Sequence, residues 1–287
     1  MTRSAADWLR AATARLAPLI GLSEAQRDAR LILRAATDWS AARLVAEGAT
    51  PLDAGPELRA DAMLARRAGH EPLAQILGHW PFYGRAFAVD RNVLTPRADT
   101  ETLIELALSD PFKTMIDLGT GSGAIAVTLL AERPTARGVA TDLSPAALSI
   151  AARNATAHGV ASRLDLAAAD WWAGIGGRFD LIVSNPPYVT AADYAALAPE
   201  VQQYEPMAAL TPGGDGLSAY RAILDGVAAH ANPGARLLLE IGALQGQALR
   251  DMLTQAGFQD VSIQTDINGK DRVAMGRVGT AQADRCR

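Results

Sequence analysis

Cysteine is almost absent from this chain of 287 residues, in which Cys286 carries the one thiol. A single cysteine cannot form a disulfide within the chain, so we expect a reducing, cytoplasmic environment. Histidine is scarce too, and the 4 histidines are scattered without the spacing of a metal-ligand set. We therefore expect no bound transition metal.

Long apolar runs are missing as well. No hydrophobic stretch comes near the roughly 18 residues needed to span a bilayer, because Arg, Asp or Gly interrupts each of them. Lysine occurs only as Lys113 and Lys270, and the formal net charge is −4. Proteins that grip duplex nucleic acid by its phosphates usually have a basic surface. The composition thus predicts no membrane span and no direct nucleic-acid binding.

The N-terminal part, residues 1–77, is expected to be helical, because apolar residues recur there at helical spacing. Two such stripes are Trp8, Ala12, Leu16 and Ala25, Ala29, Ile32, Ala36. Ser4 and Ser23 are expected to cap the two helices concerned. A small packing domain and a docking surface for a macromolecular substrate both fit this part, and we predict the second.

The rest of the chain has a different pattern. Residues 78–99 are expected to form a β-hairpin linker. Residues 100–278 alternate strands with helices, which is typical of a mostly parallel, Rossmann-like α/β sheet. The strands expected in this sheet are 115–118, 138–141, 164–167, 181–184, 237–241, 261–265 and 273–276. Residues 279–287 are expected to be a frayed tail.

The first motif that indicates chemistry is a glycine-rich turn after the first of these strands, Asp117-Leu118-Gly119-Thr120-Gly121-Ser122-Gly123. Glycine lets the backbone turn sharply and lets a ligand come close to the main chain. Asp142 ends the second strand, where a carboxylate can accept hydrogen bonds from both hydroxyls of a ribose. Together these features predict a nucleoside-containing cofactor, and they leave an NAD enzyme open as an alternative.

The second motif directly follows the strand at 181–184 and has the sequence Asn185-Pro186-Pro187-Tyr188. Two prolines stop the strand and hold Asn185 at its C-terminal end, the edge where open α/β sheets bind ligands. The Asn185 side-chain oxygen and the Pro186 carbonyl can each accept an N–H bond from a planar nitrogen, and Tyr188 offers a flat face for stacking. Since such a nitrogen is a poor nucleophile, the motif suits an enzyme that orients it toward a methyl donor.

With these motifs the sequence resembles the class I methyltransferases that carry Asn-Pro-Pro-Tyr, and among them the HemK-type release-factor glutamine methyltransferases. The resemblance covers residues 71–277. Further stretches that carry it are Glu71-Pro72-Leu73-Ala74 to Gly78, Leu94-Thr95-Pro96-Arg97-Ala98-Asp99-Thr100-Glu101, Tyr204-Glu205-Pro206, Gly213-Gly214-Asp215-Gly216-Leu217 and Tyr220-Arg221. Ala98 stands where that family usually has a second proline, a departure that affects only local stiffness.

The resemblance implies the class I S-adenosylmethionine-dependent methyltransferase fold and S-adenosyl-L-methionine as the cofactor. The cofactor-binding residues that it implies are Gly119, Thr120, Gly121, Ser122, Gly123, Asp142, Asp170, Trp171 and Asn185. The implied catalytic residues are Asn185, Pro186 and Tyr188, and the implied substrate-binding residues are Asn185, Pro186, Pro187 and Tyr188. Arg97 and Thr100 are expected near the active-site mouth. For Trp171 and its neighbour Trp172, a place in the ordinary core is the alternative.

The resemblance also implies the substrate: the glutamine of the Gly-Gly-Gln motif in class I peptide chain release factors, which act in translation termination. A methyltransferase acting on a ribosomal protein's glutamine would look nearly the same in its catalytic part. A DNA adenine-N6 methyltransferase shares Asn-Pro-Pro-Tyr but normally needs a sizeable base-reading region. A cofactor-binding scaffold without activity would be expected to have lost Asn185, Tyr188 or a loop glycine, and all of these are present.

Overall fold

The structure is a computed structural model that describes residues 3–279. It divides into two compact units. The first comprises the residues up to Gly78 together with Pro199–Tyr204, and the second comprises His79–Ala198 and the residues from Glu205 onward. Pro199–Tyr204 therefore groups with helices from much earlier in the chain, which the sequence did not indicate. Cys286 and nearly all of the predicted tail lie outside the described residues.

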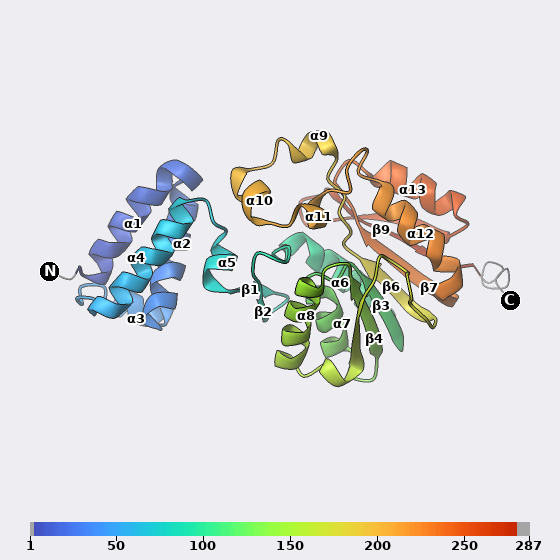
Figure 1. Ribbon diagram of the computed structural model, residues 1–287, viewed down its shortest axis with the longest axis horizontal. Helices are drawn as coiled ribbons and strands as arrows, with labels where there is room; N and C mark the ends of the chain where they lie inside the picture. The colour runs from blue at the N-terminus through green and yellow to red at the C-terminus, as the bar shows by residue number, and fades with distance from the viewer. Residues whose placement is uncertain (1–2, 280–287) are drawn as a thin grey trace. The chain divides into compact units, whose positions relative to one another are not determined.

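The first unit is built from helices. They are α1 (Ala5–Ile20), α2 (Leu22–Thr37), α3 (Ala41–Ala46), α4 (Ala54–Ala68), α5 (Leu73–Leu77) and α10 (Pro199–Tyr204) (Figure 1). The helices α1, α2 and α4 pack together, because their apolar stripes, with Trp8 and Ile32 at the centre, are fully buried. Ser4 caps α1, and its Oγ accepts from the Asp7 N–H at 3.1 Å. The prediction for Ser23 was wrong, since α2 begins at Leu22 with Gly21 before it.

A buried ion pair lies inside this first unit. Arg67 Nε donates to the Asp28 carboxylate at 2.8 Å, and the two side chains are only 5% and 0% exposed. Arg67 Nη1 also donates to Glu200 of α10 at 2.8 Å, and Gln75 Nε2 donates to the Tyr204 carbonyl at 2.9 Å. These bonds hold α10 against the earlier helices.

Replacing Asp28 is expected to destabilise the first unit strongly. Asp28→Ala leaves the buried Arg67 guanidinium without its fully buried partner, and removing one partner of a buried ion pair costs about 3–5 kcal/mol. A urea titration of the full chain should show this fall in the free energy of unfolding. Glu47→Ala, which removes an exposed pair with Arg43, should change it little. Equal stability of the two variants would contradict this account of the core.

The second unit contains a two-stranded hairpin and a seven-stranded sheet. The hairpin pairs β1 (His79–Phe82) with β2 (Arg85–Ala88). The strands of the large sheet, in spatial order, are β5 (Leu164–Ala168), β4 (Arg137–Asp142), β3 (Thr114–Leu118), β6 (Phe179–Ser184), β7 (Ala231–Glu240), β9 (Asp271–Arg277) and β8 (Gln259–Thr265). The strands from β5 to β7 are parallel to one another, whereas β9 runs antiparallel to β7 and β8. The predicted fold class is confirmed.

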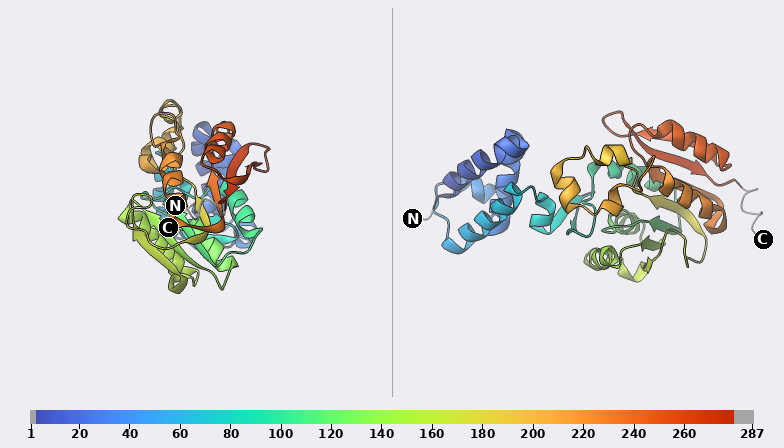
Figure 2. Two further views of the ribbon diagram at one scale, coloured as in Figure 1. Left: turned by 90° about the vertical axis from the view of Figure 1, so that its right-hand side faces the viewer. Right: turned by 45° about the horizontal axis from the view of Figure 1, so that its top comes forward.

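Helices cover both faces of the large sheet (Figures 1 and 2). One face carries α6 (Glu101–Leu108), α7 (Ala124–Glu132) and α8 (Pro145–Ala157), and the other carries α12 (Ser218–His230) and α13 (Gly246–Gln255). Successive strand residues point to opposite faces, so Met115 packs with α7 while Ile116 packs with α12 and α13. The short helices are η1 (Ala98–Thr100), η2 (Ala161–Arg163), α9 (Ala191–Tyr194) and α11 (Met207–Leu210). No helix among residues 3–279 is long and apolar enough to cross a membrane.

The strand order determines where a ligand can bind. From β3 the chain proceeds to β4 and β5 on one side, and then returns to β6 on the other side of β3. The loops after β3 and β6 therefore leave in opposite directions, and open α/β sheets bind ligands at this switch point. Gly119 follows β3 and Asn185 follows β6, so the two sequence motifs meet there.

Candidate active site

A cavity of about 480 Å³ lies at this edge of the sheet, within the second unit. The predicted site residues in its lining are Arg97, Thr100, Gly119, Thr120, Gly121, Ser122, Asp142, Asp170, Trp171, Asn185 and Pro187. Gly123, Pro186 and Tyr188 are not in the lining. Lining residues that the sequence did not single out include Phe82, Val93, Leu143, Ala208 and Ala209.

The glycines of the turn after β3 have two different structural roles. Gly119 and Gly121 have φ angles of 72° and 56°, and a Cβ on either would meet no other atom within 4 Å. Glycine is therefore required there by the left-handed backbone and leaves room toward the cavity. At Gly123 a Cβ would lie 3.2 Å from Ala151 of α8. Gly123 thus allows α7 and α8 to pack closely, which explains its absence from the cavity lining.

Asp117, in strand β3, anchors this turn through hydrogen bonds. Its fully buried carboxyl accepts a hydrogen bond from Thr120 Oγ1 at 2.6 Å and one from the Ala126 N–H at 3.3 Å. Burial raises the pKa of Asp117 to about 7, against the effect of these hydrogen bonds. The carboxyl ties the turn to the first turn of α7.

Asp142, at the end of β4, holds the turn from the other side. Its Oδ2 accepts from the Gly121 N–H at 2.8 Å, and its Oδ1 accepts from the Ser144 N–H at 2.9 Å. A carboxylate offers about four lone-pair sites, so both oxygens can accept further bonds on the cavity side. The residue therefore shapes the turn and also presents an acceptor to a ligand.

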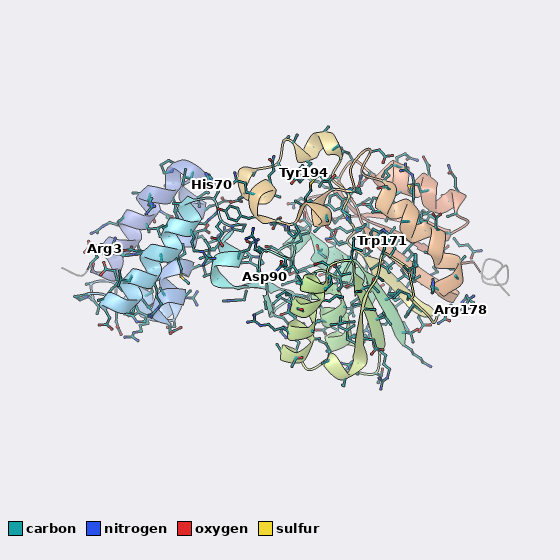
Figure 3. The ribbon with its side chains drawn as sticks, in the orientation of Figure 1. Arg3, His70, Asp90, Trp171, Arg178 and Tyr194 are labelled. Atoms are coloured by element: carbon teal, nitrogen blue, oxygen red, sulfur yellow. The ribbon has the colours of Figure 1, made fainter. Side chains whose placement is uncertain are left out.

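The two neighbouring tryptophans lie in different environments. Trp171 lines the cavity next to Asp170, and Figure 3 shows it at the opposite end of strand β6 from Arg178. Trp172 Nε1 donates to the Ile223 carbonyl of α12 at 2.8 Å, and its ring stacks on His230 with 4.6 Å between centroids. Both rings pack against the core cluster on the α12 and α13 face, but of the two only Trp171 also lines the cavity.

Asn185 is held at the end of β6. The Ser184 hydroxyl before it donates to the Leu118 carbonyl at 2.6 Å, which joins the ends of β6 and β3. The Asn185 Nδ2 donates to Thr100 Oγ1 at 3.4 Å, and Thr100 itself is buried. The side-chain amide therefore stands at a defined place on the cavity wall.

Tyr188 packs away from the cavity lining. Its ring lies against the core cluster that α12 and α13 share, and burial, followed by the Glu240 charge, raises its pKa to about 12. Its carbonyl accepts from Gln245 Nε2 at 3.0 Å, and a Cβ on Gly216 would lie 2.4 Å from that oxygen. No local signal in the sequence pointed to Gln245. The predicted stacking on a substrate by Tyr188 stays a prediction.

Arg97 connects two of the quoted stretches at the cavity wall. Its Nη2 donates to Glu205 Oε2 at 2.7 Å. Burial raises the pKa of Glu205 while the Arg97 charge lowers it. Pro206, the next residue, lines the cavity with Arg97. The stretch before α6 and the stretch after α10 thus contribute to one wall.

Models of two protein families match separate parts of the chain. The model described as "Methyltransferase small domain" matches residues 97–217. The model described as "PrmC N-terminal domain" matches residues 7–78. The first match contains both motifs of the cavity wall, and the second begins within α1 and covers the sequence of the helices α2 to α5.

Several curated proteins are similar over nearly the whole length. The chain is 55% identical to a protein of Cereibacter sphaeroides, with 96% of this chain and 99% of that protein covered. It is 42% identical to one of Burkholderia pseudomallei (88% and 91% covered) and 40% identical to one of Geobacter sulfurreducens (96% of each covered). All three bear the name "Release factor glutamine methyltransferase".

Solved structures of low sequence identity share the fold. A methyltransferase from Pyrococcus furiosus has a TM-score of 0.53 at 16% identity, with 76% of this chain and 99% of that one covered. The hMettl16 catalytic domain in complex with the MAT2A 3'UTR hairpin 6 has a TM-score of 0.56 at 15% identity, with 76% and 82% covered. At these identities the likeness extends to the fold alone.

Proposed function

Since the chain belongs to the release factor glutamine methyltransferase family, we propose that it methylates the glutamine of the Gly-Gly-Gln motif in class I peptide chain release factors. The methyl group passes from S-adenosylmethionine to the side-chain amide nitrogen of that glutamine. One observation carries the proposal: Asn185 lines the same cavity as the turn at Gly119 and Gly121 and as Asp142. A planar nitrogen and a nucleoside cofactor can therefore meet at one place.

The cavity fits S-adenosylmethionine in size and in chemistry. Its volume of about 480 Å³ lies in the usual range for small-molecule sites. The Asp142 carboxylate is proposed to accept hydrogen bonds from the ribose, Trp171 to contact the adenine, and the backbone at Gly119 and Gly121 to hold the methionyl end. When bound, the cofactor supplies a methyl group on a sulfonium, which is a good leaving group.

The chain's own task is then to orient the glutamine amide. The lone pair of an amide nitrogen is delocalised, so its reactivity depends on its direction relative to the methyl group. Asn185 Oδ1 and the Pro186 carbonyl are proposed to accept the two N–H bonds of the substrate amide. The proposed role of Pro186 is supported by its position in the chain between two lining residues, Asn185 and Pro187.

The helical first unit is proposed to contact the body of the release factor. A groove of about 470 Å³ on this unit supports the proposal, because apolar side chains and arginines line it together. Its lining includes Leu9, Leu31, Val45, Arg30 and Arg34, and Val45 is 86% exposed. An exposed apolar groove of this kind is typical of a surface that binds another protein.

The choice of substrate is testable with labelled S-adenosylmethionine and three separate acceptors: a purified unmethylated class I release factor, ribosomal proteins, and a DNA duplex containing adenine. We expect label in the release factor alone, because the curated relatives are named for this substrate. A release factor whose Gly-Gly-Gln glutamine is replaced by alanine is the control and should take up no label. Preferred labelling of ribosomal proteins or DNA would contradict the proposed function.

A further inference from the structure

A buried carboxyl lies next to Asn185, at the end of β7. β7 pairs in parallel with β6, and Leu239 stands opposite Ser184, so the next residues along, Glu240 and Asn185, are neighbours across the sheet. Glu240 is only 2% exposed. A buried acid is costly unless hydrogen bonds or charges compensate it. The strand before it, Leu237 to Leu239, is wholly apolar, so packing alone does not account for a glutamate.

Two side chains of the cavity wall act on this carboxyl. Thr100 of η1 and Asn185 are polar neighbours of the carboxyl that lower the pKa of Glu240, and Asn185 Nδ2 donates to Thr100 Oγ1 at 3.4 Å. The three side chains are therefore neighbours, contributed by η1, the residue after β6 and the end of β7. Within residues 3–279, Glu240 Oε2 has no hydrogen-bond partner, so the carboxyl retains capacity to accept.

The charges around the group come from β9 and η1. Arg272 of β9 lies 3.0 Å from Asp99 and 3.2 Å from Asp266, measured from Nη2 to the carboxylate oxygens. Burial raises the pKa of Glu240 to about 7, whereas hydrogen bonding and the Arg272 charge lower it and Asp99 raises it. The glutamate thus has a cationic neighbour, and this neighbour is shared with two other acids.

We propose that Glu240, together with Thr100, is a positioning residue that fixes which end of the Asn185 amide faces the cavity. An asparagine amide can turn over with little change of shape, but its oxygen only accepts and its NH₂ only donates. In its carboxylate form Glu240 only accepts, so this form selects the NH₂ end of Asn185. The oxygen end then faces the cavity, where a substrate N–H needs an acceptor. Hydrogen bonds in such a chain also polarise one another, which strengthens Asn185 Oδ1 as an acceptor.

This inference rests on the proposed function, because it gives Asn185 Oδ1 the task of binding the acceptor amide. Glu240→Gln tests it, since glutamine keeps the shape but can offer an NH₂ as readily as an oxygen. We expect kcat for release-factor methylation to fall by about 10- to 100-fold, as the loss of a hydrogen bond to a charged group does. The dissociation constant for S-adenosylmethionine should stay the same. Thermal stability should be equal or higher, because the variant removes a buried charge.

Thr100 and Asp180 supply matched variants. Thr100→Ser keeps the hydroxyl and should retain most of the activity, whereas Thr100→Val keeps the shape and should lose it. Asp180, at the other end of β6, accepts from the Lys113 and Thr114 N–H groups at 2.9 and 3.0 Å, so Asp180→Asn should leave kcat unchanged.

A Glu240→Gln enzyme with the wild-type kcat would overturn this inference and leave the proposed function standing. A fall in kcat that follows a fall in stability would overturn it too, in favour of a structural role. A wild-type enzyme that labels no release factor would overturn the proposed function and this inference with it.

Discussion

Asn185→Ala is expected to reduce methyl transfer by roughly 10³-fold or more while the cofactor still binds. Misplacing a reactant by about 1 Å can lower the reaction rate by about 10²-fold. Loss of a preorganised hydrogen-bonding group lowers kcat by a further 10²- to 10³-fold, roughly. Both losses apply here, because the side chain at the end of β6 is the acceptor proposed to direct the substrate nitrogen. The turn after β3 does not depend on this side chain, since Asp117 and Asp142 hold it.

Single-turnover rates and calorimetric titration with S-adenosylmethionine separate the two effects. The rate should collapse in Asn185→Ala, and the dissociation constant should change by no more than a few fold. Asn268→Ala, which removes a side chain from the turn between β8 and β9, is the matched control and should behave as the wild type. Near-normal turnover in Asn185→Ala would rule out the role assigned to this residue.

Asp142→Ala is expected to weaken cofactor binding by about 100-fold or more. Hydrogen bonds to a charged group contribute about 1.5–3 kcal/mol each, and the carboxylate is proposed to accept from two ribose hydroxyls. Its loss also frees the Gly121 and Ser144 N–H groups that it holds at 2.8 and 2.9 Å, so the turn loses part of its preorganisation. Turnover at saturating cofactor should suffer less than affinity.

The measurement is the dissociation constant of S-adenosylmethionine for each variant by calorimetry. Asp165→Ala is the matched control, because Asp165 lies on the neighbouring strand β5 with an exposed side chain, and it should bind the cofactor as the wild type does. If Asp142→Ala leaves the dissociation constant unchanged, Asp142 does not hold the ribose and another acceptor must be sought on the cavity wall.

The residues at the ends of β3, β4 and β6 could be predicted from the sequence because each has a local signal. Gly119 and Gly121 follow one apolar run, Asp142 ends a second, and Asn185 with its two prolines follows a third. Parallel strands place their C-terminal ends at one edge, so a pattern read along the chain was enough to place these side chains together. The cavity lining contains all four of these residues.

Features that depend on contacts between distant segments could not be predicted in this way. Whether Trp171 or Trp172 faces the cavity is decided by the Ile223 carbonyl and His230 of α12. The place of Tyr188 is decided by Gln245 and by the loop at Gly216. The local sequence around the tryptophan pair does not say which ring faces the cavity. The local sequence around Tyr188 does not say where its ring packs.

Strand β7 shows a further limit of the sequence pattern. The strand was expected at 237–241, but it begins at Ala231. Pro233 and Gly234 follow this start and normally indicate a turn. The structure accommodates them with an irregular register against β6, between Phe179 and Leu181. Glu240, near the end of the same strand, has no local sequence signal. Its proposed positioning role depends on Thr100, which comes much earlier in the chain.

The central claim is that this site transfers a methyl group to a glutamine amide nitrogen, and the position of the added methyl tests it most directly. Purified unmethylated release factor would be incubated with S-adenosylmethionine and either the wild type or Asn185→Ala, and the peptide containing Gly-Gly-Gln would be sequenced by tandem mass spectrometry. We expect one methyl group on the glutamine side chain with the wild type and none with Asn185→Ala. A methyl group on any other residue, or an unmodified glutamine after the cofactor has been shown to bind, would contradict it.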